Sequence, residues 1–597
     1  MEINCGKINE KNDGDEVTVY GWCRYIRDHG GKLFIDLADR YGITQLVFEK
    51  EIKKEADELG KEYVIKVNGK VRKRSRETID TKNPTGMVEI NVDAFELVNK
   101  SKLIPFEITE ERENLLPSED IRFKYRYIDL RRKRMIKTIE FRDKATKTIR
   151  KFFWDNDFLE LETPYLVRDT YDASGSRTFL VPSRVNKGKF YSLPQSPQIY
   201  KQLCMIGGLD KYFQIARVFR DEDPREDRQP EFTQVDLEVS FKDENYIQDL
   251  IERLFKRLFK EVLGKDLKIP FAHMDYKDSM NDYGNDKPDL RFSNKLIDIT
   301  TEAKLSNYDI IKRIASNGGN VRAVVFDVDF TSKECTIKKN YMLELIDLAK
   351  RLGLKGLTWM FMHNDALESE PITIAETMKP IEKPLLKKLG AKEGNIIVIG
   401  ADMSEPILLS ALSKLRRIFD KKIGKFDTET AFLWVDNFPL FEKDEITGAL
   451  QPSHNPFVSP NAETEKLLYS EPEKVIGRKY DLVLNGIEIG GGAIRIKNSD
   501  MQRKIFEIIG VPKEDIDRSM GFLIEALSYG APIHGGLALG LDRVISVLMG
   551  DDDIKDFILF PKNRRGQSPL DSSPSSINSG RLKDDFNIKL EKDVKID

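Results

Sequence analysis

Residues 212–241 hold side chains that could bind a nucleoside triphosphate. The stretch reads YFQIARVFRDEDPREDRQPEFTQVDLEVSF and predicts two strands, Tyr212–Arg220 and Phe232–Phe241, joined by an eleven-residue loop with six acidic residues. Arg220 ends the first strand, the loop carries Arg225 and Arg228, and Phe232 interrupts the polar face of the second strand. Guanidinium groups bind phosphate through paired hydrogen bonds, and an aromatic ring can stack on a base. The alternative for such a hairpin is a solvated polar face without a ligand.

The second predicted strand has two different faces, because side chains alternate along a strand. One face carries Thr233, Val235, Leu237, Val239 and Phe241. The other face carries Phe232, Gln234, Asp236 and Glu238. We expect the first face to pack in a core and the second to meet something polar.

Residues 480–496, YDLVLNGIEIGGGAIRI, contain a second group of candidates. Asp481 and Glu488 are predicted on one strand, followed by a glycine turn at 490–492 and by Arg495 on the returning strand. Two carboxylates this close repel each other unless a cation lies between them, and Mg²⁺ bridging ATP phosphates is the natural occupant. Glycines remove side chains where a ligand must approach the backbone.

Residues 535–550, GGLALGLDRVISVLMG, predict a glycine-rich strand and then a helix that opens at Asp542 and Arg543. A strand that enters a buried helix is the plain alternative, and it explains the apolar residues. It does not explain Arg543 at the joint between the two elements.

The composition bounds the kind of protein that carries these groups. A chain of 597 residues predicts roughly three to five domains. With 40% hydrophobic and 33% charged residues and a net charge of −3, it has no overall basic field, so nucleic acid must bind through local patches. Two basic runs, 70–76 and 131–134, are candidates, although a solvated face is the better interpretation of either alone.

The cysteines and the hydropathy pattern indicate a soluble protein of a reducing compartment. The four cysteines lie far apart with no C-x-x-C pair, which argues against structural zinc and against a disulfide framework. The N-terminal residues have no apolar signal core, and no apolar run approaches the roughly 20 residues that span a bilayer. We expect an intracellular, cytoplasmic location without a membrane segment.

Residues 16–98 predict five short strands separated by turns, which suits a small barrel of the oligonucleotide-binding type. In the strand KLFIDL, alternation places Leu33, Ile35 and Leu37 in the core and leaves Phe34 and Asp36 outside. An outward aromatic ring on such a barrel is a stacking platform for an unpaired base. An incidental exposed phenylalanine is the alternative.

The remaining segments predict structural elements without candidate binding or catalytic groups. The charged segment 103–130 contains Pro105 and Pro117 and predicts a hinge. A helix over 134–156, with apolar residues at helical spacing, leads into a strand that ends at Pro164. Residues 293–424 alternate strands and amphipathic helices and suggest no chemistry.

The pattern FRDED…R.QPEFTQ.D.E in residues 219–238 resembles motif 2 of the class II aminoacyl-tRNA synthetases, in the form of the aspartyl family. The helix, strand and proline of 134–164 resemble motif 1, which implies a homodimer interface, and 535–550 resembles motif 3. The segments YSLPQSPQIYKQ and YGNDKPDLRF also match this family. Together these elements cover nearly the whole chain in family order.

The resemblance implies an α+β fold: an N-terminal OB-fold β-barrel, a class II catalytic domain on an antiparallel β-sheet flanked by helices, and an inserted α/β domain. The implied boundaries are an anticodon-binding barrel at 1–104, a hinge at 105–130, a catalytic domain in two parts at 131–292 and 425–562, an insertion at 293–424 and a C-terminal extension at 563–597.

The resemblance implies an aspartate–tRNA ligase. It would activate L-aspartate with ATP to aspartyl-adenylate and pyrophosphate, with Mg²⁺ as cofactor, and then transfer aspartate to the 3′-terminal adenosine of tRNA(Asp). Whether tRNA(Asn) is also charged stays open. The alternatives are an asparaginyl- or lysyl-tRNA synthetase, an amide-forming ligase that uses no tRNA, and a nucleic-acid-binding regulator without catalysis.

The family motifs assign roles to individual residues of this chain. The implied catalytic residues are Arg220, Glu222 and Arg543. The implied aspartate-binding residues are Ser174, Ser196, Gln198, Lys201, Gln234, Asp236, His454 and Arg495. The implied ATP-binding residues are Arg220, Glu222, Arg228, Gln229, Phe232, Glu488, Gly540 and Arg543. The implied metal ligands are Asp481 and Glu488, and the implied anticodon contacts are Arg27, Phe34 and Gln45.

Two positions depart from the family pattern. Ser174 stands where a glutamate usually meets the substrate ammonium, and either Asp172 replaces it or the loop is rebuilt. Asn455 stands where the family has the second of two adjacent histidines. His454 is retained, as a participant in binding or as a structural hydrogen-bonding residue.

Overall fold

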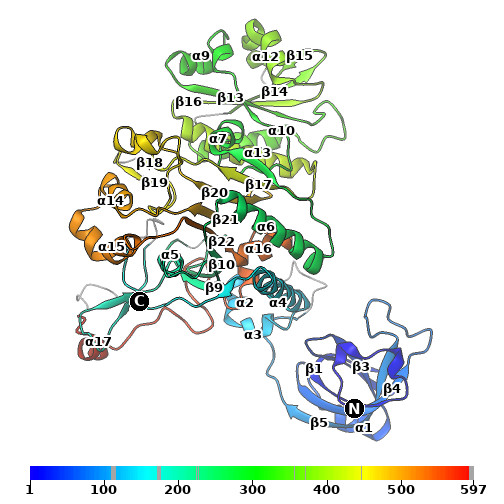
Figure 1. Cartoon of the computed structure of the whole chain (residues 1–597). Coiled ribbons are helices and arrows are strands. Elements are labelled where there is room, and N and C mark those ends of the chain that lie inside the picture. Colours follow the sequence, from blue (N-terminus) through cyan, green and yellow to red (C-terminus); the bar gives the residue numbers. More distant parts are fainter. Residues whose placement is uncertain are drawn as a thin grey trace. The chain divides into compact units, whose positions relative to one another are not determined.

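The computed structural model describes residues 1–108, 116–170, 177–223, 225, 227–354, 357–369, 372–444 and 447–589 (Figure 1). The chain forms two compact units. The first comprises Met1–Arg142 with Lys555–Ser575, and the second comprises Asp143–Ile554 with Ser576–Asp597. Among the described residues, no helix combines the length and the apolar character needed to cross a bilayer.

The first unit contains the predicted five-stranded barrel. Its strands are β1 (Glu16–His29), β2 (Lys32–Ala38), β3 (Ile43–Phe48), β4 (Val64–Lys73) and β5 (Val88–Asn99), closed in the order β1-β2-β3-β5-β4. The pair β3–β5 is parallel and the other pairs are antiparallel. The predicted alternation in β2 is confirmed, because Leu33, Ile35 and Leu37 are buried in the barrel core while Phe34 and Asp36 are not.

Short helices follow the barrel within the first unit: α2 (Glu119–Lys124), α3 (Arg126–Asp129) and the start of α4 (Lys133–Trp154). Part of the predicted hinge is therefore ordered structure. Buried Arg126 donates to Asp129 Oδ2 at 2.6 Å and to the backbone carbonyls of Ile558 and Leu559, each at 3.0 Å. These bonds fix the segment after the 3₁₀ turn η8 (Lys555–Phe557) against α3.

The second unit is built on an eight-stranded sheet. Its strands, in spatial order, are β11 (Ala272–Asp275), β17 (Phe432–Asp436), β20 (Lys479–Leu484), β21 (Ile487–Ile494), β22 (His534–Gly540), β10 (Glu231–Ser240), β9 (Lys211–Phe219) and β6 (Leu159–Glu160). The two edge pairs are parallel, and every pair between them is antiparallel. The helices α5 (Gln198–Ile206), α6 (Glu244–Leu258) and α16 (Leu541–Leu548) lie along these strands (Figure 1). The prediction of an antiparallel sheet flanked by helices is confirmed.

One predicted turn is wrong. Asp481 lies on β20 and Glu488 on β21, and the chain reverses between them at Asn485 and Gly486, which have φ angles of 54° and 76°. Asn-Gly is the strongest short hairpin signal because both positions require positive φ. The glycines 490–492 lie inside β21 instead of forming the turn.

The bounds of the hairpin β9–β10 agree with the prediction to within one residue. The burial of individual side chains differs from the prediction. Gln234, Asp236 and Glu238 on the predicted polar face are all at least 92% buried. Phe241, predicted on the packing face, lies outside the strand with φ 59° and is 73% exposed. The left-handed turn that ends β10 directs this ring to the surface.

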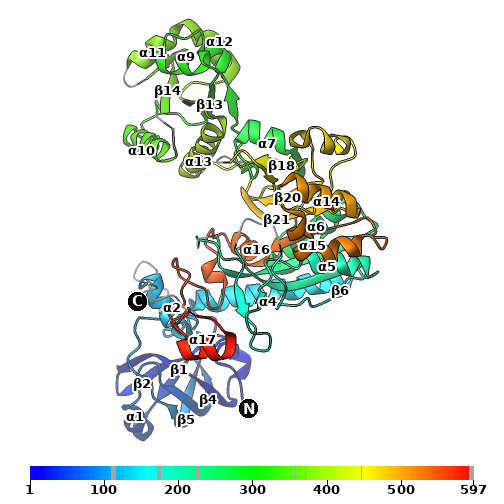
Figure 2. The ribbon, with the colours of Figure 1, turned by 90° about the vertical axis from the view of Figure 1, so that its left-hand side faces the viewer.

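The inserted segment forms its own five-stranded sheet in the order β12-β13-β16-β14-β15. The strands are β12 (Leu296–Asp298), β13 (Asn320–Phe326), β14 (Leu357–His363), β15 (Ala366–Glu368) and β16 (Ile396–Asp402). One face packs on α10 (Lys339–Arg351) and α13 (Glu405–Ile423), and the other on α9 (Asp309–Ser316), α11 (Ile372–Met378) and α12 (Glu382–Leu389) (Figure 2). A mixed inserted domain was predicted, and its described strand pairs are all antiparallel, so the arrangement is α+β and not α/β.

Smaller elements complete the second unit. They are the hairpins β7 (Leu180–Pro182) with β8 (Phe190–Ser192) and β18 (Phe441–Lys443) with β19 (Leu450–Pro452), and the helices α7 (Tyr276–Tyr283), α8 (Thr300–Ala303), α14 (Ser499–Ile508), α15 (Lys513–Leu527) and α17 (Ser579–Phe586).

Candidate active site

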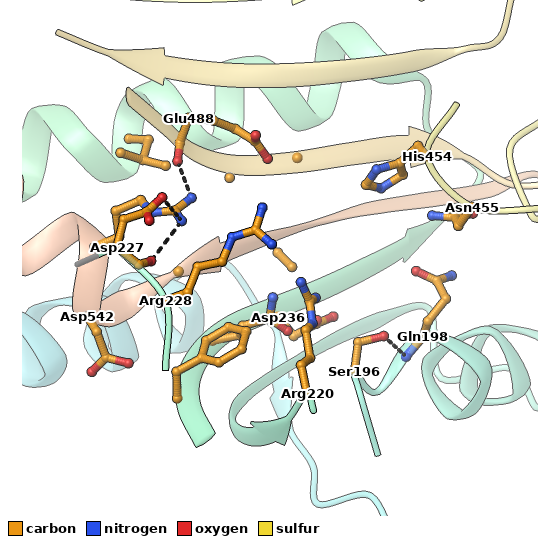
Figure 3. Close-up of a pocket in the computed structure, with 18 of the residues that line it drawn as sticks. Ser196, Gln198, Arg220, Asp227, Arg228, Asp236, His454, Asn455, Glu488 and Asp542 are labelled. Carbon is orange, nitrogen blue, oxygen red and sulfur yellow. Dashed lines mark hydrogen bonds and ion pairs between the residues drawn. The ribbon is translucent and has the colours of Figure 1, made fainter. Parts of the chain in front are cut away.

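A cavity of about 400 Å³ opens on the large sheet of the second unit, and segments distant in sequence line it (Figure 3). Strands β10, β21 and β22, the start of α5 and the start of α16 all contribute side chains. The predicted site residues that line the cavity are Ser196, Gln198, Lys201, Arg220, Glu222, Arg228, Gln229, Phe232, Gln234, Asp236, His454, Glu488, Gly540, Arg495 and Arg543. Ser174 and Asp172 fall outside the described residues.

One end of the cavity is a buried charge network. Lys201 Nζ lies 2.5 Å from Asp236 Oδ1 and 3.1 Å from Glu238 Oε2. Arg495 Nε donates to Glu238 Oε1 at 3.0 Å, and its Nη2 donates to Glu238 Oε2 at 3.4 Å. All four side chains are at least 97% buried, so each charge depends on its neighbours and not on water.

The strand register explains how Glu238 reaches Arg495 across three strands. Glu238 on β10 faces Gly536 on β22, which in turn faces Ala493 on β21. A Cβ at position 536 would lie 2.1 Å from Glu238 Oε2, so only glycine leaves room for this carboxylate. Glu238 is a positioning residue, because it holds two nitrogens of Arg495 and directs the third.

Several polar atoms at this end have no hydrogen-bond partner among the described residues. They are Gln198 Nε2, Gln234 Oε1, Asp236 Oδ2 and Arg495 Nη1. A buried polar atom left without a partner costs about 1–3 kcal/mol, so such atoms rarely gather unless a ligand completes them. Two donors and two acceptors in one pocket suit a small ligand with both an ammonium and a carboxylate.

The network has perturbed ionisation. Burial raises the pKa of Asp236 despite the opposing charge of Lys201. Burial acts in the same direction on Glu238, but Arg495 and Lys201 outweigh it and hold the pKa of this carboxyl below its usual range. Burial would lower the pKa of Arg495, yet Glu238 raises it overall. The end of the cavity therefore keeps a permanent guanidinium charge.

The other end of the cavity combines arginines with an aromatic ring. The Arg220 guanidinium lies 5.2 Å from the centre of the Phe232 ring, and Arg220 Nε donates to Gln195 O at 3.4 Å. Arg228 Nη1 contacts Glu222 Oε2 at 2.6 Å. Figure 3 shows Arg220 and Arg228 pointing into the space that Glu488 borders. Side chains of this kind suit a triphosphate with a stacked base.

Arg543 is held at the joint between β22 and α16. Its Nη1 donates to the backbone carbonyl of Glu488 at 2.8 Å, and its Nη2 donates to the carbonyl of Asp227 at 3.1 Å. The neighbouring Asp542 is 98% buried, and its Oδ2 accepts from the backbone N–H of Thr233 at 2.8 Å. This bond ties the start of α16 to β10, and Arg543 and Phe232 both line the cavity.

His454 and Asn455 lie together at the cavity edge (Figure 3). Burial and the positive charges of Lys479, Arg495, Arg220 and Lys201 lower the pKa of His454 well below its ordinary value, so the ring is neutral at pH 7. Asn455 Oδ1 accepts from the backbone N–H of Phe457 at 3.0 Å. This departure from the family pattern has a local structural role in the loop.

Asp481 and Glu488 were predicted as metal ligands, and the structure places them on facing strands. Asp481 Oδ1 and Glu488 Oε1 lie 2.5 Å and 3.8 Å from the point that a Cβ of residue 491 would occupy, so Gly491 leaves this space to the carboxylate oxygen of Asp481. Asp481 Oδ1 is buried and has no hydrogen-bond partner in the described part of the chain. Burial raises the pKa of Asp481 to about 7, and Glu488 adds to this effect.

These two carboxylates fit Mg²⁺ as a partner of ATP. No three His, Cys, Asp or Glu side chains converge as a metal-binding group within the described ranges. Mg²⁺ commonly takes only one or two protein carboxylates and completes its octahedral shell with phosphates and water. The two nearby carboxylates, one of them with an oxygen that has no partner in the described structure, meet that requirement.

Sequence reasoning missed residues that support this site. Glu238 belonged to the quoted motif, but only the three-strand register reveals its bonds to Arg495. Lys479 lies two residues before Asp481 on the same strand face, a spacing that could have identified it. The segment YGNDKPDLRF also carries ion pairs: Lys287 lies 3.5 Å from Asp286 and 3.7 Å from Glu488, and Arg291 pairs with Asp289 at 2.6 Å.

The predicted anticodon residues form a separate group on the outside of the barrel. Arg27 faces Phe34 across β1 and β2, and Asp36 faces Gln45 across β2 and β3. Arg27 makes a bidentate pair with Asp36 at 2.7 and 2.9 Å, and Gln45 Nε2 donates to Glu89 Oε2 at 2.8 Å. Partly exposed Phe34 therefore stands beside hydrogen-bonding groups, as a base platform requires.

Comparison with known families agrees with this architecture. Residues 118–564 match the family described as tRNA synthetases class II (D, K and N), and residues 17–98 match the OB-fold nucleic acid binding domain. The chain belongs to the class II tRNA synthetases of the D, K and N group. The cavity lies inside the first match and the barrel is the second, so both predicted sites fall within family domains.

Curated relatives match nearly the whole chain of this synthetase. The "Aspartate--tRNA(Asp/Asn) ligase" of Caldanaerobacter subterraneus subsp. tengcongensis is 43% identical over 98% of each chain. The "Aspartate--tRNA ligase" of Clostridium kluyveri is 42% identical over 97% of each chain. The "Aspartate--tRNA(Asp/Asn) ligase" of Aquifex aeolicus is 43% identical over 98% of each chain.

Solved structures show the same fold at lower identity. Asparaginyl-tRNA synthetase from Pyrococcus horikoshii, complexed with asparaginyl-adenylate, is 18% identical with a TM-score of 0.59 over 94% of this chain and 98% of the other. A putative aspartyl-tRNA synthetase from Leishmania major Friedlin is 19% identical, also with a TM-score of 0.59, over 94% and 93%.

Proposed function

We propose that the chain is an aspartate–tRNA ligase. The observation that carries this proposal is the buried Arg495, whose Nη1 has no partner among the described residues at the polar end of the cavity. A fixed, always charged guanidinium selects a ligand with a second carboxylate. The relatives named above are aspartate–tRNA ligases over nearly full length, which supports the same substrate here.

In the first step, the α-carboxylate of aspartate attacks the α-phosphorus of ATP, and pyrophosphate leaves. Both reactants are anions, so positive charge must be fixed before they meet. Arg220 and Glu222, which line the cavity, would act where the α-phosphate and the carboxylate come together, and Arg543 would hold the γ-phosphate. Phe232 stacks on adenine. No protein nucleophile is needed, because positioning and electrostatics supply the rate.

The other proposed nucleotide contacts come from Arg228, Gln229, Gly540 and Glu488. Asp481 and Glu488 would hold Mg²⁺, which offsets the charge of the phosphates when bound. The carboxylate oxygen of Asp481 that has no partner in the described structure supports this assignment.

Aspartate lies with its side chain at Arg495 and Lys201 in this proposal. Its ammonium meets acceptors of Gln234 and Asp236, while Ser196, Gln198 and neutral His454 border the same pocket. Asparagine would leave Arg495 buried without a counter-charge, which costs on the order of several kcal/mol.

In the second step, the 3′-hydroxyl of the terminal adenosine of tRNA attacks the carbonyl carbon of aspartyl-adenylate; the ester bond of aspartyl-tRNA forms, the anhydride bond to phosphate breaks, and AMP leaves. The barrel at 1–104 would read the anticodon of tRNA(Asp) through Arg27, Phe34 and Gln45. Some relatives are named aspartate–tRNA ligase and others aspartate–tRNA(Asp/Asn) ligase, so tRNA(Asn) is a second candidate substrate.

Assembly and location follow the family expectation. Exposed Trp154, Leu159, Tyr165 and Leu166 on and after the motif 1 helix support a homodimer interface. The free thiols of the described structure support a cytoplasmic location. The catalytic parts are then 131–292 and 425–562, separated by the insertion at 293–424, with a hinge at 105–130 and an extension at 563–597.

Aminoacylation of transcribed tRNA tests the proposal. Radioactive aspartate should be attached to tRNA(Asp) in the presence of ATP and Mg²⁺, and a parallel tRNA(Asn) transcript decides the second substrate. Adenylate formation without transfer to any tRNA would favour an amide-forming ligase. Transfer of asparagine or lysine instead would assign the other members of the group, and absence of both steps would favour a regulator.

A further inference from the structure

Lys479 is a buried cation that the proposed chemistry does not use. It lies on β20 two residues before Asp481, so the two side chains share one face of the strand. Its Nζ is 2.9 Å from Asp481 Oδ2 and 3.6 Å from the centre of the Phe438 ring. The side chain is only 7% exposed, so the aromatic ring and the carboxylate replace water around the ammonium.

The facing strand leaves room for this arrangement. Lys479 faces Ala493 on β21, and Asp481 faces Gly491. A Cβ at position 491 would lie 2.5 Å from Asp481 Oδ1, which shows that this oxygen occupies the space of a missing side chain. The small residues on β21 therefore hold the ion pair in one geometry.

The two oxygens of Asp481 have different environments. Oδ2 contacts Lys479, whereas Oδ1 is buried without a hydrogen-bond partner in the described structure and faces the Glu488 side. Lys479 thus fixes the carboxylate with one oxygen engaged and the other free for a cation. Glu488 has its own ammonium neighbour, Lys287, at 3.7 Å, but that lysine is 46% exposed and can move away.

We propose that Lys479 is the built-in counter-ion of Asp481 and makes the metal site depend on nucleotide. A free divalent cation would meet carboxylates that two lysines already neutralise, and Lys479 cannot leave its buried position. A cation that arrives bound to a triphosphate is accompanied by the negative charge of the phosphates. This negative charge offsets the repulsion between the cation and the two lysine ammonium groups. The inference rests on the proposed function, because it takes Asp481 and Glu488 as the metal-binding pair.

Binding of Mn²⁺, followed by electron paramagnetic resonance, tests the inference independently of activity. Wild-type protein without nucleotide should bind Mn²⁺ weakly, and addition of α,β-methylene ATP should create a protein-dependent site. Lys479→Met should strengthen nucleotide-free Mn²⁺ binding by about tenfold or more, because it removes a like charge from the site. Lys479→Arg keeps the charge and should stay weak.

A matched control and a second measurement complete the experiment. Lys388→Met removes an equally paired lysine in the inserted domain, where Lys388 lies 2.9 Å from Glu302, and should leave Mn²⁺ binding unchanged. If Lys479→Met does not fold, wild type alone decides: strong nucleotide-free Mn²⁺ binding that Asp481→Asn abolishes would overturn the inference. Equal affinity of Lys479→Met and wild type would do the same.

Failure of the proposed metal site has a different signature. In that case wild type with α,β-methylene ATP binds no more Mn²⁺ than the nucleotide alone, and Asp481→Asn and Glu488→Gln change nothing. A nucleotide-dependent site that those two variants remove, together with unchanged affinity in Lys479→Met, would refute only the role of Lys479.

Discussion

The cavity on the large sheet and the outer face of the barrel both combine arginine, carboxylate and an aromatic ring, but they use them differently. In the cavity, Arg495 is 97% buried and one of its nitrogens lacks a partner among the described residues. On the barrel, Arg27 is half exposed and fully engaged with Asp36 through two bonds. The Arg495 end of the cavity keeps a nitrogen available for a ligand, whereas a partner that binds Arg27 on the barrel would have to replace its bonds to Asp36.

This difference has an energetic meaning. A buried donor without a partner raises the free energy of the protein until a ligand accepts its hydrogen bond. A ligand that supplies this acceptor therefore binds more tightly and is preferred over one that lacks it. Exposed ion pairs contribute about 0–1 kcal/mol and are screened by salt, so losing one on the barrel changes little by itself. Substitutions in the two regions should therefore differ in the size of their effect on activity and in the reaction step that they impair.

Arg495→Leu should have the largest effect. Leucine removes the charge that meets the aspartate side chain and leaves Glu238 without its main partner, so aspartate-dependent pyrophosphate exchange should fall by about three orders of magnitude or more. ATP binding, measured by calorimetry, should persist because the nucleotide end is separate. Exchange at the wild-type rate would remove Arg495 from its proposed role.

Arg220→Ala should slow adenylate formation by about two orders of magnitude, the scale for losing one preorganised charge. Single-turnover kinetics with saturating aspartate and ATP measures this step directly. Arg217→Ala on β9, the strand that ends just before Arg220, is the control, because Arg217 pairs with Glu231 and Thr233 and does not line the cavity. A rate for Arg220→Ala within threefold of wild type would contradict the assignment.

Phe34→Ala should act at the other region and at a later step. Loss of a stacking ring costs about 1–3 kcal/mol of single-strand binding, so the KM for tRNA should rise roughly tenfold. Exchange measured without tRNA does not involve the barrel face and serves as the internal reference. An unchanged KM for tRNA would show that this ring is an incidental exposed phenylalanine.

The smallest expected effect is on the stability of the folded protein, and it arises outside both the cavity and the barrel face. Burial raises the pKa of Asp420 on α13 to about 7, against the opposing charge of Arg416, while the unfolded chain keeps a value near 3.8. The folded protein retains a proton that the unfolded chain releases, so this carboxyl makes the protein less stable as the pH rises from about 4 to 7.

Asp420→Asn should reduce that pH dependence. The amide oxygen can still accept the bond that Asn294 donates at 3.0 Å, but it cannot ionise. The loss of stability between pH 5 and pH 8 should shrink by roughly 1–2 kcal/mol, measured by calorimetric melting of both proteins at each pH. Parallel curves for variant and wild type would show that Asp420 does not titrate in this range.

Local patterns predicted much of the fold. Alternation placed Leu33, Ile35 and Leu37 in the barrel core, and the bounds of the motif 2 hairpin agree within one residue. The turn at Asn485 and Gly486 was also local and could have been predicted, but the more prominent glycine run drew the prediction to the wrong place. The prediction that Phe241 packs in the core was wrong, because its positive φ ends the strand and the alternation of side chains no longer applies there.

The sequence predicted which side chains belong to the site, but it did not predict which of them contact each other. The motifs supplied most of the side chains that line the cavity, yet none of them indicates that Glu238 holds Arg495 or that Lys479 holds Asp481. The first contact depends on the register of β10, β22 and β21, which join residues far apart in sequence. Such pairing is decided by tertiary packing, which one sequence does not encode in a readable local pattern.

Pyrophosphate exchange by wild-type protein across the twenty amino acids tests the central claim most directly. The buried guanidinium of Arg495 predicts rapid exchange with aspartate and a rate with asparagine that is at least about a thousandfold lower in kcat/KM, because the amide leaves that charge unpaired. Exchange with asparagine within tenfold of aspartate, or exchange with lysine instead, would contradict the account.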